Sequence, residues 1–456
     1  MKDTSTNLLH DLIAALRGTR NLAYPFDMSR LLRSVRLVLK PLATVFRGAL
    51  KCLFPLAAVS AFPAAYADSA SHGSWDGVAY AYLGNTAPCM DSVLNPGNQI
   101  ARLVEHSQTA EARFNLKAEH DQLRLALRPI VLWQQDRNTL GRQTRHEAYL
   151  SQGEAQWRMT EAWNLAAGRE LLTWGPGQFR SPANPFFFDN GRSNPLRELS
   201  GLDVVKLSWT PDTRRTLSVA RIASTGHFAG NVDTWRDTWL LKADRRGDAW
   251  AGGLALAKKG GQGMFVGAHL QYTLNDALLL YGELGSSTRL DALQSPPDPA
   301  QPFSIAPESG RRANELLGVT YTFMNGQSLA GEYLHHGHGF TTGERGAYFT
   351  RTASAVLPAG AATLGMALGT APPLLGRDYL HVVWQNNPLE NEGYWRLMWT
   401  HNLGDGGDEL SGYGEYTLSG RTSAFALAVL PRGGVRQEFS ALFSRMVTLG
   451  LKVALP

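Results

Sequence analysis

Four stretches of the chain end in the same way, with an aromatic residue, a threonine and then a polar turn. The endings are Trp209-Thr210, Tyr272-Thr273, Tyr321-Thr322 and Trp399-Thr400, and the turns are 211–215, 275–277, 325–327 and 404–408. Residues before each ending alternate between apolar and polar, so one face of each expected strand is apolar. Such strands, with an aromatic residue at a fixed depth near a short turn, are typical of transmembrane β-barrels with an interfacial aromatic girdle.

Other segments alternate in the same way. In 446–455, Val447 and Leu449 lie opposite Thr448 and Gly450. The alternative interpretation is a soluble all-β protein, in which a second apolar sheet would have to cover this face. We also find no helical segments that could cover it. At about 9–11 residues per strand plus connections, the chain accommodates about 16–18 strands. The sequence therefore predicts an all-β fold, a transmembrane antiparallel β-barrel.

The connections between the expected strands fall into two length classes. Short ones are the turns above and 119–122, and long ones are 134–144, 175–200, 289–311 and 337–377. This alternation is the expected split between periplasmic turns and extracellular loops. The long loop 337–377 contains an alanine-rich stretch, 353–369, in which we expect a short helix rather than a strand.

Residues 1–67 have the features of a secretory signal. Six Lys and Arg residues lie in 28–51, an apolar run covers 53–62, and Ala65-Tyr66-Ala67 provides a cleavage site. Pro55 and Pro63 interrupt the run, which argues against the alternative of an inner-membrane anchor. Met28 is an alternative start. The barrel is predicted for 68–456, in the outer membrane of a Gram-negative bacterium, with membrane lipid and the barrel-assembly machinery as partners.

Charge and cysteine content exclude several classes of partner. The leader holds nine of the 44 Lys and Arg residues but only three of the 39 Asp and Glu residues, so the remainder is nearly neutral. The positive net charge therefore gives no reason to expect a nucleic-acid partner. Cys52 lies in the leader, which leaves Cys89 alone and rules out a disulfide within the mature chain or a cysteine-rich metal site.

The most specific local pattern follows the strand that ends near Trp174. Gly168–Gly177 (GRELLTWGPG) leads into Ser181–Phe188 (SPANPFFF) and Gly191–Glu198 (GRSNPLRE). Three consecutive phenylalanines must be buried, and the lumen is the nearest place. We therefore expect 175–200 to fold inward and narrow the pore, with a surface loop as the alternative. The predicted constriction residues are Arg180, Asp189, Arg192, Arg197 and Glu198.

At this loop the chain resembles outer-membrane barrels of the porin, alginate-export and capsule-assembly type. Some capsule-assembly members carry a similar Trp-Gly-Pro-Gly strand end with an Asn and a Pro soon after, here Trp174–Gly177, Asn184 and Pro185. The resemblance implies a barrel of about 18 strands that handles or displays an acidic polysaccharide.

Charged residues recur on the polar faces of the expected strands. A charge on the lipid face costs about 2–4 kcal/mol at mid-membrane, so these side chains should point into the lumen. Basic strands early in the chain and acidic strands late would create a transverse electric field across the lumen. The alternative is that these Arg and Glu side chains pair with each other inside a closed barrel. The predicted lumen charges are Arg113, Lys117, Arg124, Arg128, Lys206, Arg396, Glu283, Glu332 and Glu415.

We find no convincing catalytic or metal-binding pattern. His335-His336-Gly337-His338 lacks the ligands that would complete a tetrahedral site and is expected to be a solvated loop. We therefore predict no cofactor, no metal and no enzyme. The expected function is a channel for polar solutes, with anionic ones favoured by the basic lumen residues, or for a polysaccharide chain.

The alternative is a closed, lectin-like barrel that binds or anchors surface polysaccharide. The aromatic rings of Trp235, Phe340, Tyr348 and Phe349 would then offer stacking faces in the outer loops. The sequence specifies neither the solute nor the oligomeric state.

Overall fold

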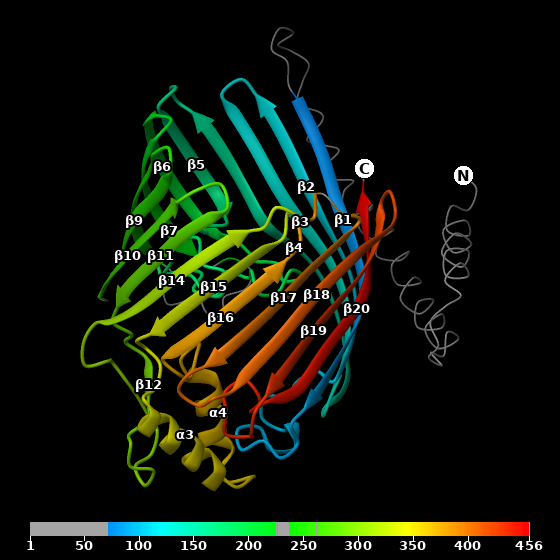
Figure 1. Ribbon diagram of the computed structural model, residues 1–456, viewed down its shortest axis with the longest axis vertical. Coiled ribbons are helices and arrows are strands. Elements are labelled where there is room, and N and C mark those ends of the chain that lie inside the picture. The colour runs from blue at the N-terminus through cyan, green and yellow to red at the C-terminus, as the bar shows by residue number, and fades with distance from the viewer. Residues whose placement is uncertain (1–71, 225, 227–236, 261–262, 390, 456) are drawn as a thin grey trace.

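The computed structural model describes residues 72–224, 226, 237–260, 263–389 and 391–455, which form a barrel of 18 strands (Figure 1). The barrel strands are β1 (His72–Pro88), β2 (His106–His120), β3 (Leu123–Asn138), β4 (Gly141–Arg158), β5 (Trp163–Glu170), β6 (Leu202–Asp212), β7 (Arg215–Ser224), β8 (Thr238–Arg246), β9 (Trp250–Lys259), β10 (Met264–Thr273), β11 (Leu278–Ser287), β14 (Arg312–Thr322), β15 (Ser328–His336), β16 (Asp378–Gln385), β17 (Gly393–Asn402), β18 (Asp408–Ser419), β19 (Thr422–Arg432) and β20 (Phe443–Leu455). The predicted leader lies outside the described residues.

The barrel closes between its first and last strands. Tyr82 on β1 lies opposite Thr109 on β2 and opposite Gly450 on β20, and both pairings are antiparallel. Closure pairs the backbone groups of every strand on both sides and leaves no open sheet edge. The predicted fold class is confirmed, and the strand count lies at the upper limit of the expected range.

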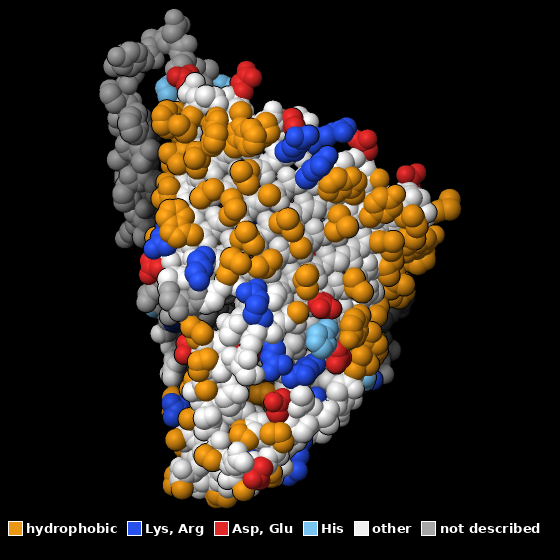
Figure 2. All heavy atoms as spheres, turned by 90° about the vertical axis from the view of Figure 1, so that its left-hand side faces the viewer, with side chains coloured by type: hydrophobic (Ala, Val, Ile, Leu, Met, Phe, Trp, Pro, Cys, Tyr) orange, Lys and Arg blue, Asp and Glu red, His pale blue; other side chains and the backbone are white. Residues whose placement is uncertain are grey.

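Alternation along the strands gives the barrel an apolar outer wall. On β14, Leu317 is 67% exposed and Val319 is 39% exposed, whereas the intervening Gly318 lies on the face that it shares with Glu332 on β15. Hydrophobic side chains spread over the outer wall in Figure 2, and charged side chains gather toward its margins. A wall of this kind is matched to lipid.

A charge in the middle of this wall should strongly destabilise the barrel. Leu317 lies at the centre of β14 and is exposed on the outer face. Replacing it with arginine should lower the free energy of unfolding from lipid by about 2–4 kcal/mol. Thr320→Arg, on the inward face of the same strand, is the matched control. Equal loss of stability for both variants, measured by urea titration in lipid vesicles, would contradict the assigned faces.

Two predicted connections were wrong. The interval 134–144 is not a loop, because β3 and β4 continue to Asn138 and Gly141 and leave only residues 139 and 140 between them. The connection at 404–408 lies at the end of the barrel that carries the long loops, not at the turn end. The segment 337–377 contributes no strand to the barrel. If it did contain one strand, every later strand would run in the opposite direction.

The long loops pack together over one end of the barrel. They contain a short 3-10 turn, η2 (Pro96–Asn98), the hairpin β12 (Ala292–Gln294) and β13 (Ser304–Ala306), and the helices α3 (Thr342–Ser354) and α4 (Ala361–Thr370). Thr341 and Glu344 form a capping box that starts α3. Loop side chains, including Leu94, Phe303 and Tyr348, share one buried apolar cluster. None of the described helices is long and apolar enough to cross a bilayer.

Candidate functional site

Residues 171–201, which join β5 to β6, form a lumen loop that lies against the inner wall of the barrel. Phe186 and Phe187 are buried with Leu202, Ile222 and other inward-facing residues of β6–β10. Phe188 stacks on His336 of β15, with ring centroids 5.1 Å apart. The three phenylalanines are therefore satisfied inside the barrel, which confirms the predicted inward fold of this loop.

Two inward-facing carboxylates hold the first half of the lumen loop. Glu283 on β11 accepts hydrogen bonds from the Gly177 and Ala183 amides, at 2.7 and 3.1 Å, and from the Ser181 hydroxyl, at 2.8 Å. Both Glu283 and its neighbour Glu332 are almost fully buried. Hydrogen bonds to ionised groups are the stronger kind, so these contacts fix the loop firmly.

Glu332, on β15, makes a matching set of contacts. It accepts from the Gln178 amide at 2.6 Å, from the Phe179 amide at 2.9 Å and from the Tyr281 hydroxyl at 2.7 Å. Four loop amides are therefore satisfied by two carboxylates of the wall. These wall carboxylates thus supply the hydrogen-bond acceptors that a helix or sheet would otherwise give to the loop amides.

A pair of wall glycines allows the loop backbone to approach closely. Gly267 on β10 and Gly285 on β11 lie opposite each other and face inward. A Cβ at Gly285 would lie 1.9 Å from the Pro182 carbonyl oxygen, and one at Gly267 would lie 2.4 Å from that of Ala183. Only glycine permits this packing, because no flexible side chain could move aside.

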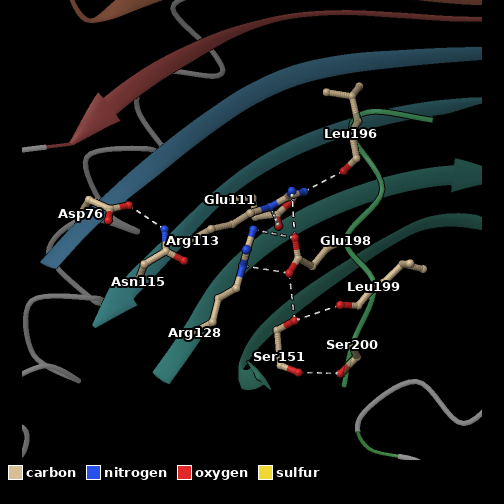
Figure 3. A network of polar contacts seen from close by, with 10 residues as sticks. All are labelled: Asp76, Glu111, Arg113, Asn115, Arg128, Ser151, Leu196, Glu198, Leu199 and Ser200. Carbon is tan, nitrogen blue, oxygen red and sulfur yellow. Dashed lines mark hydrogen bonds and ion pairs between the residues drawn. The ribbon is translucent and has the colours of Figure 1, made fainter. Parts of the chain in front are cut away.

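The second half of the lumen loop is held by an ionic network on β2–β4 (Figure 3). Glu198 accepts from Arg113 at 3.2 Å, from Arg128 at 3.0 Å and from the Ser151 hydroxyl at 3.0 Å. Arg113 also bonds Glu111 at 2.6 Å and the Leu196 carbonyl oxygen at 2.7 Å. The lumen loop is therefore attached to the wall through both its first and its second half, and it cannot move as a free flap.

No protein-family model matches the chain, and no curated protein matches it in sequence. Among solved structures, Pseudomonas aeruginosa OccK11 (OpdR) superposes with a TM-score of 0.50 at 14% identity, over 84% of this chain and 96% of that one. The fold is that of a porin-type outer-membrane barrel. Acinetobacter baumannii OccAB1 (TM-score 0.49, 10% identity, 84% and 96% covered) and a triple mutant of the Rhodopseudomonas blastica porin (0.42, 9%, 84% and 100%) are also similar.

The predicted constriction residues have different roles in this porin-type barrel. Arg197 forms an ion pair with Asp189. Arg192 donates to the carbonyl oxygens of Gly175, Pro176 and Gly177 at 2.6–3.1 Å, and so closes the loop on itself. Glu198 holds the ionic network described above. Burial opposes ionisation of Asp189, but the guanidinium groups of Arg180 and Arg197 lower the pKa of this carboxyl below its ordinary value.

Arg180 contacts an aromatic ring rather than a carboxylate. Its guanidinium lies over the Phe179 ring, 4.2 Å from the centroid, and donates to the Phe179 carbonyl oxygen at 2.7 Å. Among the described residues, no carboxylate oxygen lies within ion-pair distance of it, that is, within 4.0 Å. Like Arg192, it therefore carries a charge without an ion-pair partner among the described residues.

All nine predicted lumen charges lie on inward positions of the strand register, and most have partners. Glu283 and Glu332 bind the lumen loop, and Arg113 and Arg128 bind Glu198. Lys206 pairs with Glu170, Lys452 with Glu415 at 2.8 Å, and Arg124 with Glu119 at 3.2 Å, while Arg396 donates to Gln178 at 3.2 Å. Lys117 is exposed and has no ion-pair partner among the described residues. Much of the lumen charge therefore positions the loop or pairs within the wall.

The sequence had suggested that the histidine cluster is a solvated loop, and this prediction was wrong. His336 is 1% exposed and contacts Asn314, and the His338 side chain is 5% exposed and bonds Glu308 at 2.8 Å. The strand β15 extends to His336, so this side chain faces the lumen rather than solvent above it. No group of three potential metal ligands occurs in the described part of the chain.

The loop 433–442 is fastened by one half-buried carboxylate that the sequence did not reveal. Glu438 accepts from the Leu375 amide at 2.8 Å, the Tyr379 hydroxyl at 2.5 Å and the Asn402 amide group at 2.7 Å. It thereby joins this loop to the 337–377 loop and to β16 and β17. Its neighbours in sequence are ordinary loop residues, and only the fold brings its partners together.

This fastening should weaken as the pH rises. Burial raises the pKa of the Glu438 carboxyl above its ordinary value. The docked loop therefore binds the proton more tightly than a free loop. Its contribution is complete below about pH 4, the ordinary glutamate pKa, and is lost as the pH passes the raised value. Tryptic cleavage after Arg436 should accelerate with pH in the native chain relative to Glu438→Gln; identical profiles would contradict this.

Proposed function

We propose that this protein is a channel in the outer membrane of a Gram-negative bacterium, and that it passes small polar solutes, with anionic ones favoured. The observation that carries the proposal is the lumen loop, which is attached to opposite parts of the inner wall of a closed, lipid-matched barrel. Pores obtain selectivity from the charges and width of such constrictions. The porin-type fold fits a protein without catalytic chemistry, and no reaction is proposed.

The orientation follows from the two ends of the barrel. The barrel strands begin at His72 and end at Leu455 on the side with the short turns, and the helices α3 and α4 lie on the other side (Figure 1). In bacterial outer-membrane barrels the short turns face the periplasm and the long loops face outward. Solutes from outside would therefore meet the long loops first and the lumen loop next.

Two observations favour small solutes over a polysaccharide chain or a lectin. A polymer needs a continuous passage, whereas Glu283, Glu332 and Glu198 hold the lumen loop across the interior. Three of the rings suggested for polysaccharide stacking, Phe340, Tyr348 and Phe349, are at most 6% exposed and belong to the buried loop cluster. Trp235 lies outside the described residues.

The proposal can be tested in planar lipid bilayers. The purified protein should give discrete conductance steps with a preference for anions. Arg180→Glu should lower the anion-to-cation permeability ratio by at least about fivefold, since one unit charge at 4 Å in water is worth about 1 kcal/mol and the substitution changes the charge by two units. Arg214→Glu, in the exposed turn between β6 and β7, is the control. No conductance from correctly folded protein, including protein with 176–198 deleted, would overturn the channel proposal.

A further inference from the structure

An open groove of about 860 Å³ runs over the outer wall of the barrel, across strands β8, β9, β10, β11 and β14. It forms where small residues interrupt the outward-facing leucines, at Gly252, Ala268 and Gly282. The leucines along its sides are exposed on the lipid face: Leu254, Leu270, Leu280, Leu284 and Leu317. The groove is therefore an apolar recess within the lipid-facing surface.

The groove follows one row of the strand register. From β8 to β14 the row consists of Arg245, Gly252, Leu270, Gly282 and Leu317, each opposite the next. It begins at the turn end of β8 and reaches the centre of β14. At about 4.8 Å per strand, the row is about 19 Å long. With strands tilted by about 35–45°, it crosses about 11–14 Å of membrane depth. One leaflet contributes about 15 Å of hydrocarbon, so the row matches a single leaflet.

Two arginines of like charge lie side by side at the turn end of the groove. Arg215 on β7 lies directly opposite Arg245, and both are exposed. Arg215 lies 3.5 Å from Asp212, and the neighbouring Arg214 is bonded to Asp248 at 2.9 Å. No carboxylate oxygen of the described residues lies within 4.0 Å of the Arg245 guanidinium. Like charges directly opposite each other destabilise a sheet, so this pair favours an anion that both can bind.

An aromatic ring marks the level of the lipid headgroups beside this pair. Trp250 lines the groove, and the Arg245 guanidinium lies over its ring, 5.7 Å from the centroid. Tryptophan is enriched at the boundary between hydrocarbon and water. Figure 2 shows basic side chains gathered along the upper margin of the apolar wall, which is the turn end of the barrel. The arginine pair therefore lies where the phosphate of a lipid would lie.

Acidic residues give the groove a direction. Glu315 lines its other end, closer than Leu317 to the loop end of β14, and is exposed. Asp244 and Glu283 also border the groove, but their carboxylates face the lumen, where they bond Lys242 and the lumen loop. A phosphate near Glu315 would be repelled, whereas one at the arginine pair would be attracted. A phospholipid should therefore bind with its headgroup at the turn end.

We propose that the groove binds an acyl chain of an anionic phospholipid from the periplasmic leaflet, with the lipid phosphate between Arg215 and Arg245. Guanidinium groups bind phosphate oxygens through paired N–H donors. The chain packs over Gly252 and Gly282 and ends near Leu317. The assignment to the periplasmic leaflet rests on the orientation proposed for the channel, but binding itself does not require conduction.

Lipid titration followed by native mass spectrometry, on the protein in a non-ionic detergent, tests the role of charge. Dipalmitoyl phosphatidylglycerol and dipalmitoyl phosphatidylcholine have the same chains and differ in net charge. Phosphatidylglycerol should bind at least about fivefold more tightly, since a basic residue near an anionic lipid is worth about 1 kcal/mol. Equal affinities for the two lipids would overturn the proposal.

Arg215→Gln and Arg245→Gln test the phosphate site. Each should weaken phosphatidylglycerol about fivefold, and the double variant should remove the preference over phosphatidylcholine. Arg421→Gln is the matched control, because Arg421 is exposed in the turn between β18 and β19 and does not line the groove. A double variant that retains the native preference would overturn the assignment.

Gly282→Leu tests the chain site by filling the groove. A Cβ at Gly282 would lie 3.3 Å from Cδ2 of Leu317, a side chain that can move aside. Dipalmitoyl phosphatidylglycerol should bind at least about fivefold more weakly, because the chain loses its packing contacts. The dihexanoyl lipid should be unaffected, because its chains end short of Gly282, about 14 Å from Arg245. Gly331→Leu is the control, since a Cβ there would meet no described atom within 4 Å and Gly331 lies outside the groove. Native affinity in Gly282→Leu would overturn the chain site.

The outcomes are distinguishable from a failure of the channel proposal. A protein that conducts but shows no preference for phosphatidylglycerol would overturn the lipid site and leave the channel intact. A preference that the arginine variants abolish, in a protein that never conducts, would support the lipid site and overturn the channel. If Gly282→Leu does not fold, the native protein decides, because equal affinities for the dipalmitoyl and dihexanoyl lipids would overturn the chain site.

Discussion

Replacing both Glu283 and Glu332 with glutamine should release the first half of the lumen loop and raise the single-channel conductance. Each carboxylate accepts three hydrogen bonds, and each glutamine would turn an amide nitrogen toward at least one of those donors. Hydrogen bonds to ionised groups contribute about 1.5–3 kcal/mol each. We therefore expect a loss of about 3 kcal/mol for each substitution, measured by urea titration, together with weaker discrimination between anions and cations in bilayer recordings.

Glu415→Gln is the matched control for this experiment. Glu415 also faces the lumen, but it bonds Lys452 and Tyr413, which belong to the wall and not to the loop. Its substitution should leave the conductance unchanged. A double variant that folds, yet conducts like the native protein, would show that Glu283 and Glu332 do not hold the constriction.

The fold could be read from the sequence because it depends on local periodicity. Alternation of the kind seen at Leu317 and Val319 determines which side chains face lipid, whichever strand is the neighbour. The inward fold of the lumen loop was predictable for a related reason. Three consecutive phenylalanines require an apolar environment, and β6–β10 provide it through residues such as Ile222 and Leu240.

Strand direction was harder to predict where periodicity is absent. Three of the four aromatic endings, at Trp209, Tyr272 and Tyr321, lie at the turn end of the barrel, but Trp399 lies at the loop end. In 337–377 the chain forms α3 and α4 and contributes no barrel strand. The alternation before this segment therefore does not predict the direction of the strands after it. An aromatic residue near a turn is compatible with either margin of the membrane.

Pairing within the site was not accessible from sequence, because it depends on which strands become neighbours. The sequence indicated that Glu283 and Glu332 face inward, but their partners are backbone amides more than 100 residues away. Gly267 and Gly285 were inconspicuous for the same reason. Their importance appears only when the carbonyl groups of Pro182 and Ala183 are placed against them. Register and loop path, rather than residue type, therefore decide which polar residues contact the lumen loop.

Glu198→Gln should have the second large effect, at the opposite attachment of the lumen loop. Glu198 is the shared acceptor of Arg113, Arg128 and Ser151, and its side chain is 10% exposed. Removing one partner of a buried ion pair leaves the remaining charge unsatisfied and costs about 3–5 kcal/mol. We expect the lower part of that range, since the Arg128 side chain is 34% exposed and can recruit water.

The same substitution should increase the preference for anions. Two guanidinium groups lose their shared carboxylate, and among the described residues Arg113 retains only Glu111 as an ionic partner. The reversal potential in a salt gradient should therefore shift toward that of the anion, while urea titration reports the lost stability. Glu119→Gln is the control, because the Arg124–Glu119 pair is exposed and such pairs contribute at most about 1 kcal/mol. A stable Glu198→Gln protein with native selectivity would show that this network neither holds the loop nor contributes to the field that a passing ion meets.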